Sequence, residues 1–82
     1  MYSLVYSDLS LKQLKKIDKE TQNRLVSSLE RSRMRPYHFV TKLVGNPYYR
    51  LRVGDYRVIL DIQNDKLIIF VIELRHRKDI YQ

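Results

Sequence analysis

The apolar residues near the start of the chain change from the spacing of a strand to the spacing of a helix. Tyr2–Tyr6 alternates in the manner of a strand and carries β-favouring side chains, which predicts a first strand. Apolar residues then recur at helical spacing: Leu11, Leu14 and Ile17. Ser10 and Gln13 have the Ser-x-x-Gln form of a capping box. We therefore expect a helix from about residue 8 to residue 17.

A second helix is predicted directly after the first. Asp18 can cap its N-terminus, with Thr21 as a later candidate. Its apolar stripe consists of three residues: Leu25, Val26 and Leu29. Pro36 forbids continuation of the helix, because proline lacks a backbone N–H and its ring clashes with the preceding turn. The two helices are expected to form an antiparallel hairpin.

The second half of the chain carries the pattern of three short strands. Residues 37–47 show no clear period and contain the turn signal Gly45-Asn46-Pro47, so we expect a connector there. Strand-like runs follow at 48–53, 56–62 and 67–74, separated by the turn sequences Gly54-Asp55 and Gln63-Asn64-Asp65. The last run, LIIFVIEL, is apolar on both alternating faces, which indicates an interior strand.

These elements predict a single α+β domain that spans residues 1–82, with the element order βααβββ. The sheet is expected to be mostly antiparallel and twisted, with the N-terminal helical hairpin packed on one of its faces.

The turn Gly54-Asp55 fixes the register of the hairpin around it. A two-residue loop that begins with glycine suits a type II′ turn, in which the flanking residues pair directly. Arg52 then lies opposite Arg57, and Arg50 lies opposite Ile59. Because side chains alternate along a strand, Arg50, Arg52 and Arg57 point to one side of the sheet, which we call the arginine face. The apolar residues between them point to the other side, towards the helices.

Like charges directly opposite each other on a sheet destabilise it by up to about 1 kcal/mol. One interpretation is a solvated basic face with Asp61 and Glu73 as local counter-charges. The other is a phosphate-binding face, because the planar guanidinium group matches phosphate oxygens with two parallel hydrogen bonds.

The overall charge supports an anionic partner. Sixteen Lys and Arg against nine Asp and Glu give a net charge of +7, which favours nucleic acid or an acidic protein. Four lysines line one side of the first predicted helix, either as a solvated face or as a source of long-range attraction: Lys12, Lys15, Lys16 and Lys19. The chain has no cysteine, no signal-peptide pattern in its first residues and no apolar run near the length of a membrane span, so we expect a cytoplasmic protein.

The C-terminal stretch RHRKDIY adds groups that can exchange protons, namely His76 and Tyr81. Either residue can also be an ordinary surface side chain. The strand that ends near Leu74 neighbours the strand of Arg57, so we expect it to carry this stretch towards the arginine face. Two histidines and no carboxylate cluster predict chemistry without a metal or another cofactor.

Three segments resemble the RelE/ParE superfamily of toxins from prokaryotic toxin–antitoxin systems, most closely its RelE branch. They are the sequence KLVG from Lys42, YRLRVGDYRVIL at Tyr49–Leu60 and FVIELRHRKDIY at Phe70–Tyr81, so the resemblance covers about half of the chain. It implies a ribosome-dependent endoribonuclease that contacts ribosomal RNA, cuts messenger RNA in the A site and is neutralised by a cognate RelB-like antitoxin. It also implies metal-free attack of the 2′-hydroxyl on the adjacent phosphate.

The resemblance also implies roles for individual residues. Arg57 and Arg77 would stabilise the phosphorane that develops, because positioned cations aimed at developing charge are a large catalytic effect. Arg50 and Arg52 would position the RNA backbone, and Lys42 is grouped with them as an RNA-binding residue. Tyr81 would orient the scissile nucleotide, stack on it or take part in proton transfer.

Two departures from the family pattern leave the identity of the general base open. The basic pair Arg50 and Arg52 replaces lysine, and the spacing from Arg77 to Tyr81 is shorter than in some relatives. His76 is a second candidate for moving the proton. We expect Arg52, Arg57 and Arg77 to share one concavity. The alternative functions are a ParE-like inhibitor of DNA gyrase and a basic binding module without catalysis.

Overall fold

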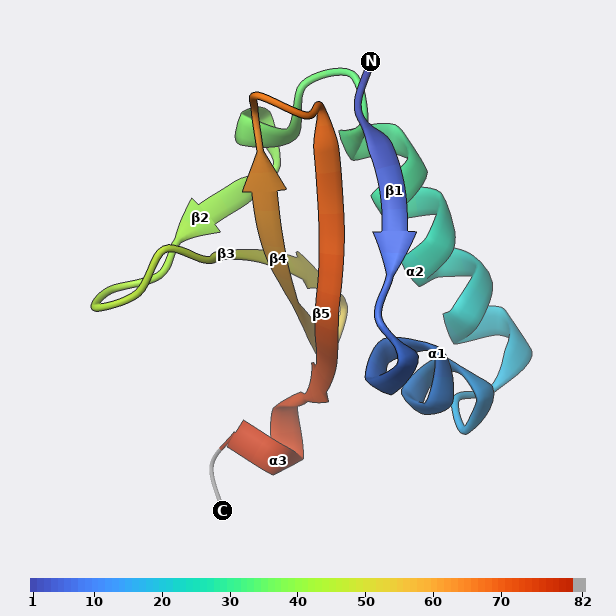
Figure 1. Cartoon of the computed structure of the whole chain (residues 1–82). Helices are drawn as coiled ribbons and strands as arrows, with labels where there is room; N and C mark the ends of the chain where they lie inside the picture. Colours follow the sequence, from blue (N-terminus) through green and yellow to red (C-terminus); the bar gives the residue numbers. More distant parts are fainter. Residues whose placement is uncertain (81–82) are drawn as a thin grey trace.

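A five-stranded sheet carries two helices on one face (Figure 1). The computed structural model describes residues 1–80. The strands are β1 (Ser3–Tyr6), β2 (Val40–Lys42), β3 (Tyr49–Val53), β4 (Tyr56–Gln63) and β5 (Ile68–His76). The helices are α1 (Asp8–Lys15), α2 (Lys19–Ser32), the short 3-10 helix η1 (Pro36–His38) and α3 (Arg77–Ile80). In this part of the chain no helix is long and apolar enough to cross a membrane.

The strands lie side by side in the order β1-β5-β4-β3-β2. β1 runs parallel to β5, and the other neighbours are antiparallel. This topology confirms the predicted α+β fold with a mostly antiparallel sheet, and it confirms that the apolar strand β5 is interior, between β1 and β4.

The prediction that residues 37–47 form only a connector is wrong. Val40–Lys42 forms β2, which pairs with Leu51, Arg50 and Tyr49 of β3. A strand of three residues is too short to show a period in sequence, and it is held by pairing with a partner farther along the chain.

The N-terminal caps of the two long helices differ in how well the sequence predicted them. Asp18 caps α2 as expected, because its Oδ2 accepts a hydrogen bond from the N–H of Thr21 at 3.0 Å. Ser10 does not cap α1; Ser7 does, and its Oγ accepts from the N–H of Ser10 at 3.0 Å. Ser10 is buried in the first turn, and the Oε1 of Gln13 accepts the backbone N–H of Leu74 instead of closing a capping box.

The core lies between α2 and the helix-facing side of the sheet. Its buried residues are Leu25, Leu29, Leu51, Val53, Val58, Leu60, Ile69, Val71 and Leu74. The apolar stripe of α2 is therefore confirmed for two of its three residues, whereas Val26 is exposed. Burial of these side chains gives roughly 1.5 to 3 kcal/mol each relative to leaving them in water, and it fixes which side of the sheet faces solvent.

A β-bulge interrupts the pairing of β4 with β5. Ile59 lies opposite Glu73 but the next residue, Leu60, lies opposite Val71, so Ile72 has no partner on β4. The extra residue shifts the alternation of side chains along β5 by one position. Val71 and Leu74 both reach the core for this reason, and Glu73 and Arg75 point to the opposite side.

Candidate functional site

Three arginines lie in a row across three neighbouring strands. Arg52 of β3 lies opposite Arg57 of β4, as predicted, and Arg57 lies opposite Arg75 of β5. Neighbouring strands are about 4.8 Å apart, so the backbone of this arginine row spans roughly 10 Å. Arg57 is half-buried, and the outer two residues are exposed. The row is a surface that can bind an extended anion.

Arg75 is the residue of this site that sequence reasoning missed. It stands in the basic stretch RHRKDIY, but without the bulge at Ile72 the alternation along β5 would turn it towards the core. The sequence of β5 does not reveal this shift, because the run is apolar on both faces. Either phase of the alternation would therefore place apolar residues in the core.

The positive charge of the row is only partly compensated. The Nε of Arg75 donates to Oε1 of Glu73 at 2.9 Å, and its Nη2 lies 2.6 Å from the same oxygen in an ion pair. The other ion pair within residues 1–80 joins Arg33 and Glu30, so in that part of the chain no carboxylate pairs with the arginine face (Arg50, Arg52 and Arg57). Asp61, the other expected counter-charge, accepts a hydrogen bond from Gln63.

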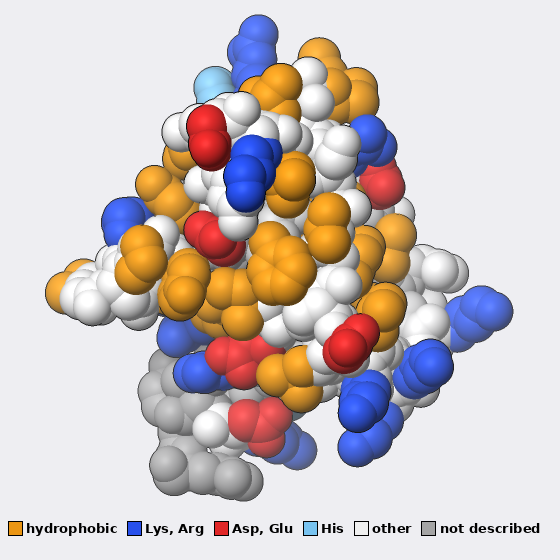
Figure 2. Space-filling model, viewed as in Figure 1, with side chains coloured by type: hydrophobic (Ala, Val, Ile, Leu, Met, Phe, Trp, Pro, Cys, Tyr) orange, Lys and Arg blue, Asp and Glu red, His pale blue; other side chains and the backbone are white. Residues whose placement is uncertain are grey.

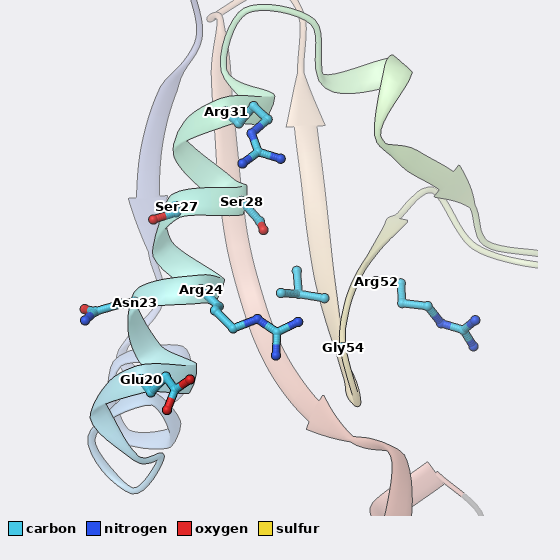
Figure 3. Close-up of a pocket in the computed structure, with 9 residues that line it drawn as sticks. Glu20, Asn23, Arg24, Ser27, Ser28, Arg31, Arg52 and Gly54 are labelled. Carbon is cyan, nitrogen blue, oxygen red and sulfur yellow. The ribbon is translucent and has the colours of Figure 1, made fainter.

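The predicted arginines line three different hollows among those formed by the described residues. Arg52 borders a groove between α2 and β3 with Arg24, Ser28, Arg31 and others, the α2 groove. Figure 3 shows that Arg24 extends from α2 towards Gly54, whereas Arg52 extends from the side of β3 that faces away from α2. Arg57 lines a hollow with Arg75, and Arg77 lines one with Asp55, His76 and Lys78. We expected Arg52, Arg57 and Arg77 to share one concavity, but each of these three hollows contains only one of them.

The backbone nevertheless holds Arg77 close to the arginine row. Its N–H donates to the carbonyl of Asp55 at 2.7 Å, which ties the start of α3 to the turn between β3 and β4. Asp55 precedes Arg57 by two residues, or about 7 Å along a strand. Arg77 and the row therefore lie at the same end of the sheet.

His76 lies on the opposite side of the sheet from Arg75, contrary to the expectation from sequence. It pairs with Tyr56, and the two rings meet edge to face with 4.9 Å between their centroids. The reason is that β5 continues to His76, so adjacent residues still alternate there. The Nδ1 of His76 accepts the N–H of Lys78 at 3.1 Å, which places the proton of the neutral ring on Nε2. The lone pair of Nδ1 is the one that can take up a proton, so the ring can act as a base only if this contact is broken.

The remaining predicted residues divide between the two sides of β2 and β3. Arg50 lies opposite Ile59 on the arginine face, as predicted. Lys42 lies opposite Tyr49 on the other side, where its Nζ donates to the carbonyl of Asn46 at 2.5 Å and lies 5.3 Å from the centre of the Tyr49 ring. Tyr81 lies outside the described residues.

A second basic surface covers α1 and the start of α2. The four lysines of the predicted stripe, Lys12, Lys15, Lys16 and Lys19, are exposed, but they do not all lie on the first helix, because α1 ends at Lys15 and Lys19 begins α2. In Figure 2 several Lys and Arg side chains project at the lower right, where Figure 1 places α1, and hydrophobic side chains occupy the centre of the view. Such a surface attracts a polyanion over long range without specifying its sequence.

A small mostly antiparallel sheet, backed by a helical hairpin and carrying a row of arginines, defines the class of protein: a toxin of the RelE/ParE fold. The family described as "ParE toxin of type II toxin-antitoxin system, parDE" matches residues 4–81. The chain therefore belongs to this family of type II toxins, within the RelE/ParE superfamily.

Solved structures of RelE–RelB complexes share the fold. The archaeal RelE–RelB complex from Pyrococcus horikoshii has a TM-score of 0.81 at 28% identity, covering 93% of this chain and 94% of that one. The RelB–RelE complex from Methanococcus jannaschii has a TM-score of 0.75 at 25% identity, with 95% of each chain covered. The E. coli RelBE complex has a TM-score of 0.81 at 23% identity, covering 93% and 96%. A sequence search among curated proteins found no match.

Proposed function

We propose that this toxin is a ribosome-dependent endoribonuclease that acts in the cytoplasm and cuts messenger RNA in the ribosomal A site. The observation that carries the proposal is the arginine row, in which Arg52, Arg57 and Arg75 lie across three strands with a single carboxylate partner among the described residues. Two or more guanidinium groups on one phosphodiester stabilise the charge that builds up when the phosphorus becomes five-coordinate.

The chemistry follows from the substrate. The 2′-oxygen of one nucleotide forms a bond to the adjacent phosphorus, and the bond from phosphorus to the 5′-oxygen of the next nucleotide breaks. The 2′-hydroxyl loses its proton and the leaving 5′-oxygen gains one, which leaves a 2′,3′-cyclic phosphate and a 5′-hydroxyl. No metal takes part in this scheme.

Each predicted residue has a role in the proposal. Arg57 and Arg77 stabilise the developing phosphorane, while Arg50 and Arg52 position the RNA backbone. Tyr81, by the family pattern, orients the scissile nucleotide or moves a proton. His76 lines the same hollow as Arg77 and is the second candidate for proton transfer, once its contact with the N–H of Lys78 opens. Lys42 adds to RNA binding from the outer strand β2.

The test is a cleavage assay with programmed ribosomes and an end-labelled message. Arg57→Ala and Arg77→Ala should each lower the rate of A-site cutting by about a hundredfold to a thousandfold, the usual effect of removing one stabilising donor. Lys66→Ala is the matched control, because it removes the same charge from an exposed turn at the other end of β4. Circular dichroism verifies that all variants fold. Parental cutting by both arginine variants would refute the site, and equal cutting of free RNA would remove the ribosome from the proposal.

Inhibition of DNA gyrase is the second candidate, because the matching family is named for ParE. A supercoiling assay with purified gyrase separates the two functions. Inhibition of supercoiling without cleavage of message supports the gyrase function, and neither activity supports a basic binding module.

We also propose a cognate RelB-like antitoxin as partner. Relatives of this fold were crystallised as RelE–RelB complexes. A chain with net charge +7 suits an acidic, partly disordered segment that folds on binding.

A further inference from the structure

The hollow that contains Arg57 and Arg75 has two chemically different ends. We call it the loop hollow, and it is lined by Leu43, Val44, Asn46, Tyr48, Arg57, Ile59, Ile72, Glu73 and Arg75. The loop between β2 and β3 supplies the first four residues, and β4 and β5 supply the rest. Its volume of about 410 Å³ is within the range of sites that hold a small molecule.

The apolar end of the loop hollow suits a planar ring. Ile59 and Ile72 come from the sheet, and the phenol ring of Tyr48 comes from the loop. Tyr48 is 37% exposed and Val44 is 99% exposed, so both keep apolar surface that a ligand can cover. Nucleic-acid bases stack on aromatic side chains of this kind.

Hydrogen bonds within the loop between β2 and β3 fix its conformation without a ligand. The N–H of Leu43 donates to the carbonyl of Tyr48 at 3.0 Å, and the N–H of Tyr48 donates to Oδ1 of Asn46 at 2.9 Å. Lys42 bonds the carbonyl of Asn46 from the other side. Because the side-chain oxygen Oδ1 of Asn46 already accepts a hydrogen bond, its side-chain NH2 group is the part that can donate to a ring nitrogen or a carbonyl oxygen of a base.

The charged end of the loop hollow suits one phosphodiester. Arg57 and Arg75 lie directly opposite each other, and Glu73 is the only acidic residue among those that line the hollow. Two arginines against one glutamate leave a net charge of +1, equal and opposite to the charge of a phosphodiester. Glu73 binds Nε and Nη2 of Arg75, so the Nη1 edge of that guanidinium is left for the phosphate.

From this arrangement we infer that the loop hollow binds one nucleotide of single-stranded RNA, with its base against Tyr48 and its phosphate on Arg57 and Arg75. The inference rests on the proposed function and adds a subsite to it. Arg75 is a binding residue there, and Glu73 is a positioning residue that fixes the direction of its guanidinium group. Purines offer a larger stacking surface than pyrimidines, so the subsite favours a purine at one position of the message.

An acidic peptide is the competing occupant, because a single carboxylate also matches a charge of +1. The aromatic ring, the amide and the apolar floor favour the nucleotide, since a carboxylate would use the two arginines alone.

The first test measures binding without cleavage. The labelled full-length protein is titrated by NMR with purine and pyrimidine RNA trinucleotides that carry 2′-O-methyl groups and cannot be cut. We expect saturable shifts of the amides of Asn46, Tyr48 and Arg75, with tighter binding of the purine probe. Tyr48→Ala and Arg75→Gln should each weaken binding about tenfold, whereas Tyr48→Phe keeps the ring and should bind like the parent. Phe39→Ala, an exposed aromatic outside the hollow, is the control.

Glu73→Gln distinguishes ligand binding from a structural role. Loss of this carboxylate should tighten binding of the anionic probe at low salt, opposite to the effect of Arg75→Gln. If Glu73 and Arg75 only stabilise the sheet, both variants should weaken binding or leave it unchanged.

The outcomes separate the subsite from the proposed function. If Arg57→Ala abolishes A-site cutting while Tyr48→Ala and Arg75→Gln cut with parental rate and base preference, the subsite is refuted and the nuclease proposal stands. If the parent does not cut but the trinucleotide shifts the hollow as expected, the subsite stands and the nuclease proposal falls. If a glutamate-rich peptide binds more tightly and displaces the trinucleotide, the hollow belongs to an acidic partner and the inference is overturned. The inference is also overturned if the trinucleotide leaves the amide chemical shifts of Asn46, Tyr48 and Arg75 unchanged.

Discussion

The hydroxyl of Ser7 donates a hydrogen bond to the carbonyl of Ile72 at 2.6 Å, at the bulge of β5. The same oxygen caps α1 by accepting the N–H of Ser10. One side chain therefore stabilises both the start of the first helix and the irregularity that turns Arg75 towards Arg57. This couples the helical layer to the candidate site.

Ser7→Ala should lower the free energy of unfolding by about 2 kcal/mol, because it removes a helix cap and leaves a bulge carbonyl without its donor. Urea denaturation of the variant and the parent measures the change. Ser3→Ala, an exposed serine on β1, is the control and should change stability by less than about 0.5 kcal/mol. A loss below that limit for Ser7→Ala would contradict the role of the bond.

Gly54→Ala and Gly45→Ala should each destabilise the protein by about 1 to 2 kcal/mol, because both glycines have positive φ, +57° and +83°. Gly54→Ala should cost a few tenths of a kcal/mol more, since its Cβ would lie 3.2 Å from Nη2 of Arg24, whereas nothing lies within 4 Å at Gly45. In an Arg24→Ala background the difference should disappear. Denaturation of the single and double variants tests this, and a difference that persists would place its origin in the turn itself.

Leu67→Ile should destabilise the protein by about 1 kcal/mol. Leu67 has a φ of +53°, a conformation that β-branched residues adopt at high cost. Leu9→Ile is a matched control, because Leu9 has the same exposure of 49% but lies in α1. This variant should lose only a few tenths of a kcal/mol of stability. Thermal unfolding of both variants measures the contrast, and equal losses would argue against strain at residue 67.

Stability should fall as the pH rises above about 10. Burial first, and then the carboxylate of Glu30, raise the pKa of Tyr6, and burial followed by nearby carboxylates raises that of Tyr56. These tyrosines ionise at a lower pH in the unfolded chain than in the folded one. Their contribution to the free energy of unfolding is therefore complete below pH 10 and is lost as the pH rises towards the folded pKa.

Tyr6→Phe should flatten this alkaline decline. The measurement is denaturant unfolding at pH 8 to 11, with tyrosinate absorbance recorded in parallel. Tyr2→Phe is the control. Parallel stability curves for the parent and Tyr6→Phe would rule out a contribution from Tyr6.

The β3–β4 hairpin was predictable because its determinants are close together in the chain. Gly54 sets the turn, and the turn sets the pairing of Arg52 with Arg57. Asp18 likewise caps a helix whose first turn is three residues away. The site beyond the hairpin was less predictable, because α3, β2 and the bulge at Ile72 have no local sequence signal.

Local spacing and turn chemistry were enough to predict both long helices, four of the five strands and the arginine pair of the β3–β4 hairpin, because these signals act over a few residues. Pairing between distant strands places Arg75 beside this pair and turns His76 to the opposite side of the sheet. The physical reason is the bulge in β5, where the carbonyl of Ile72 accepts a hydrogen bond from the hydroxyl of Ser7, 65 residues away in the chain.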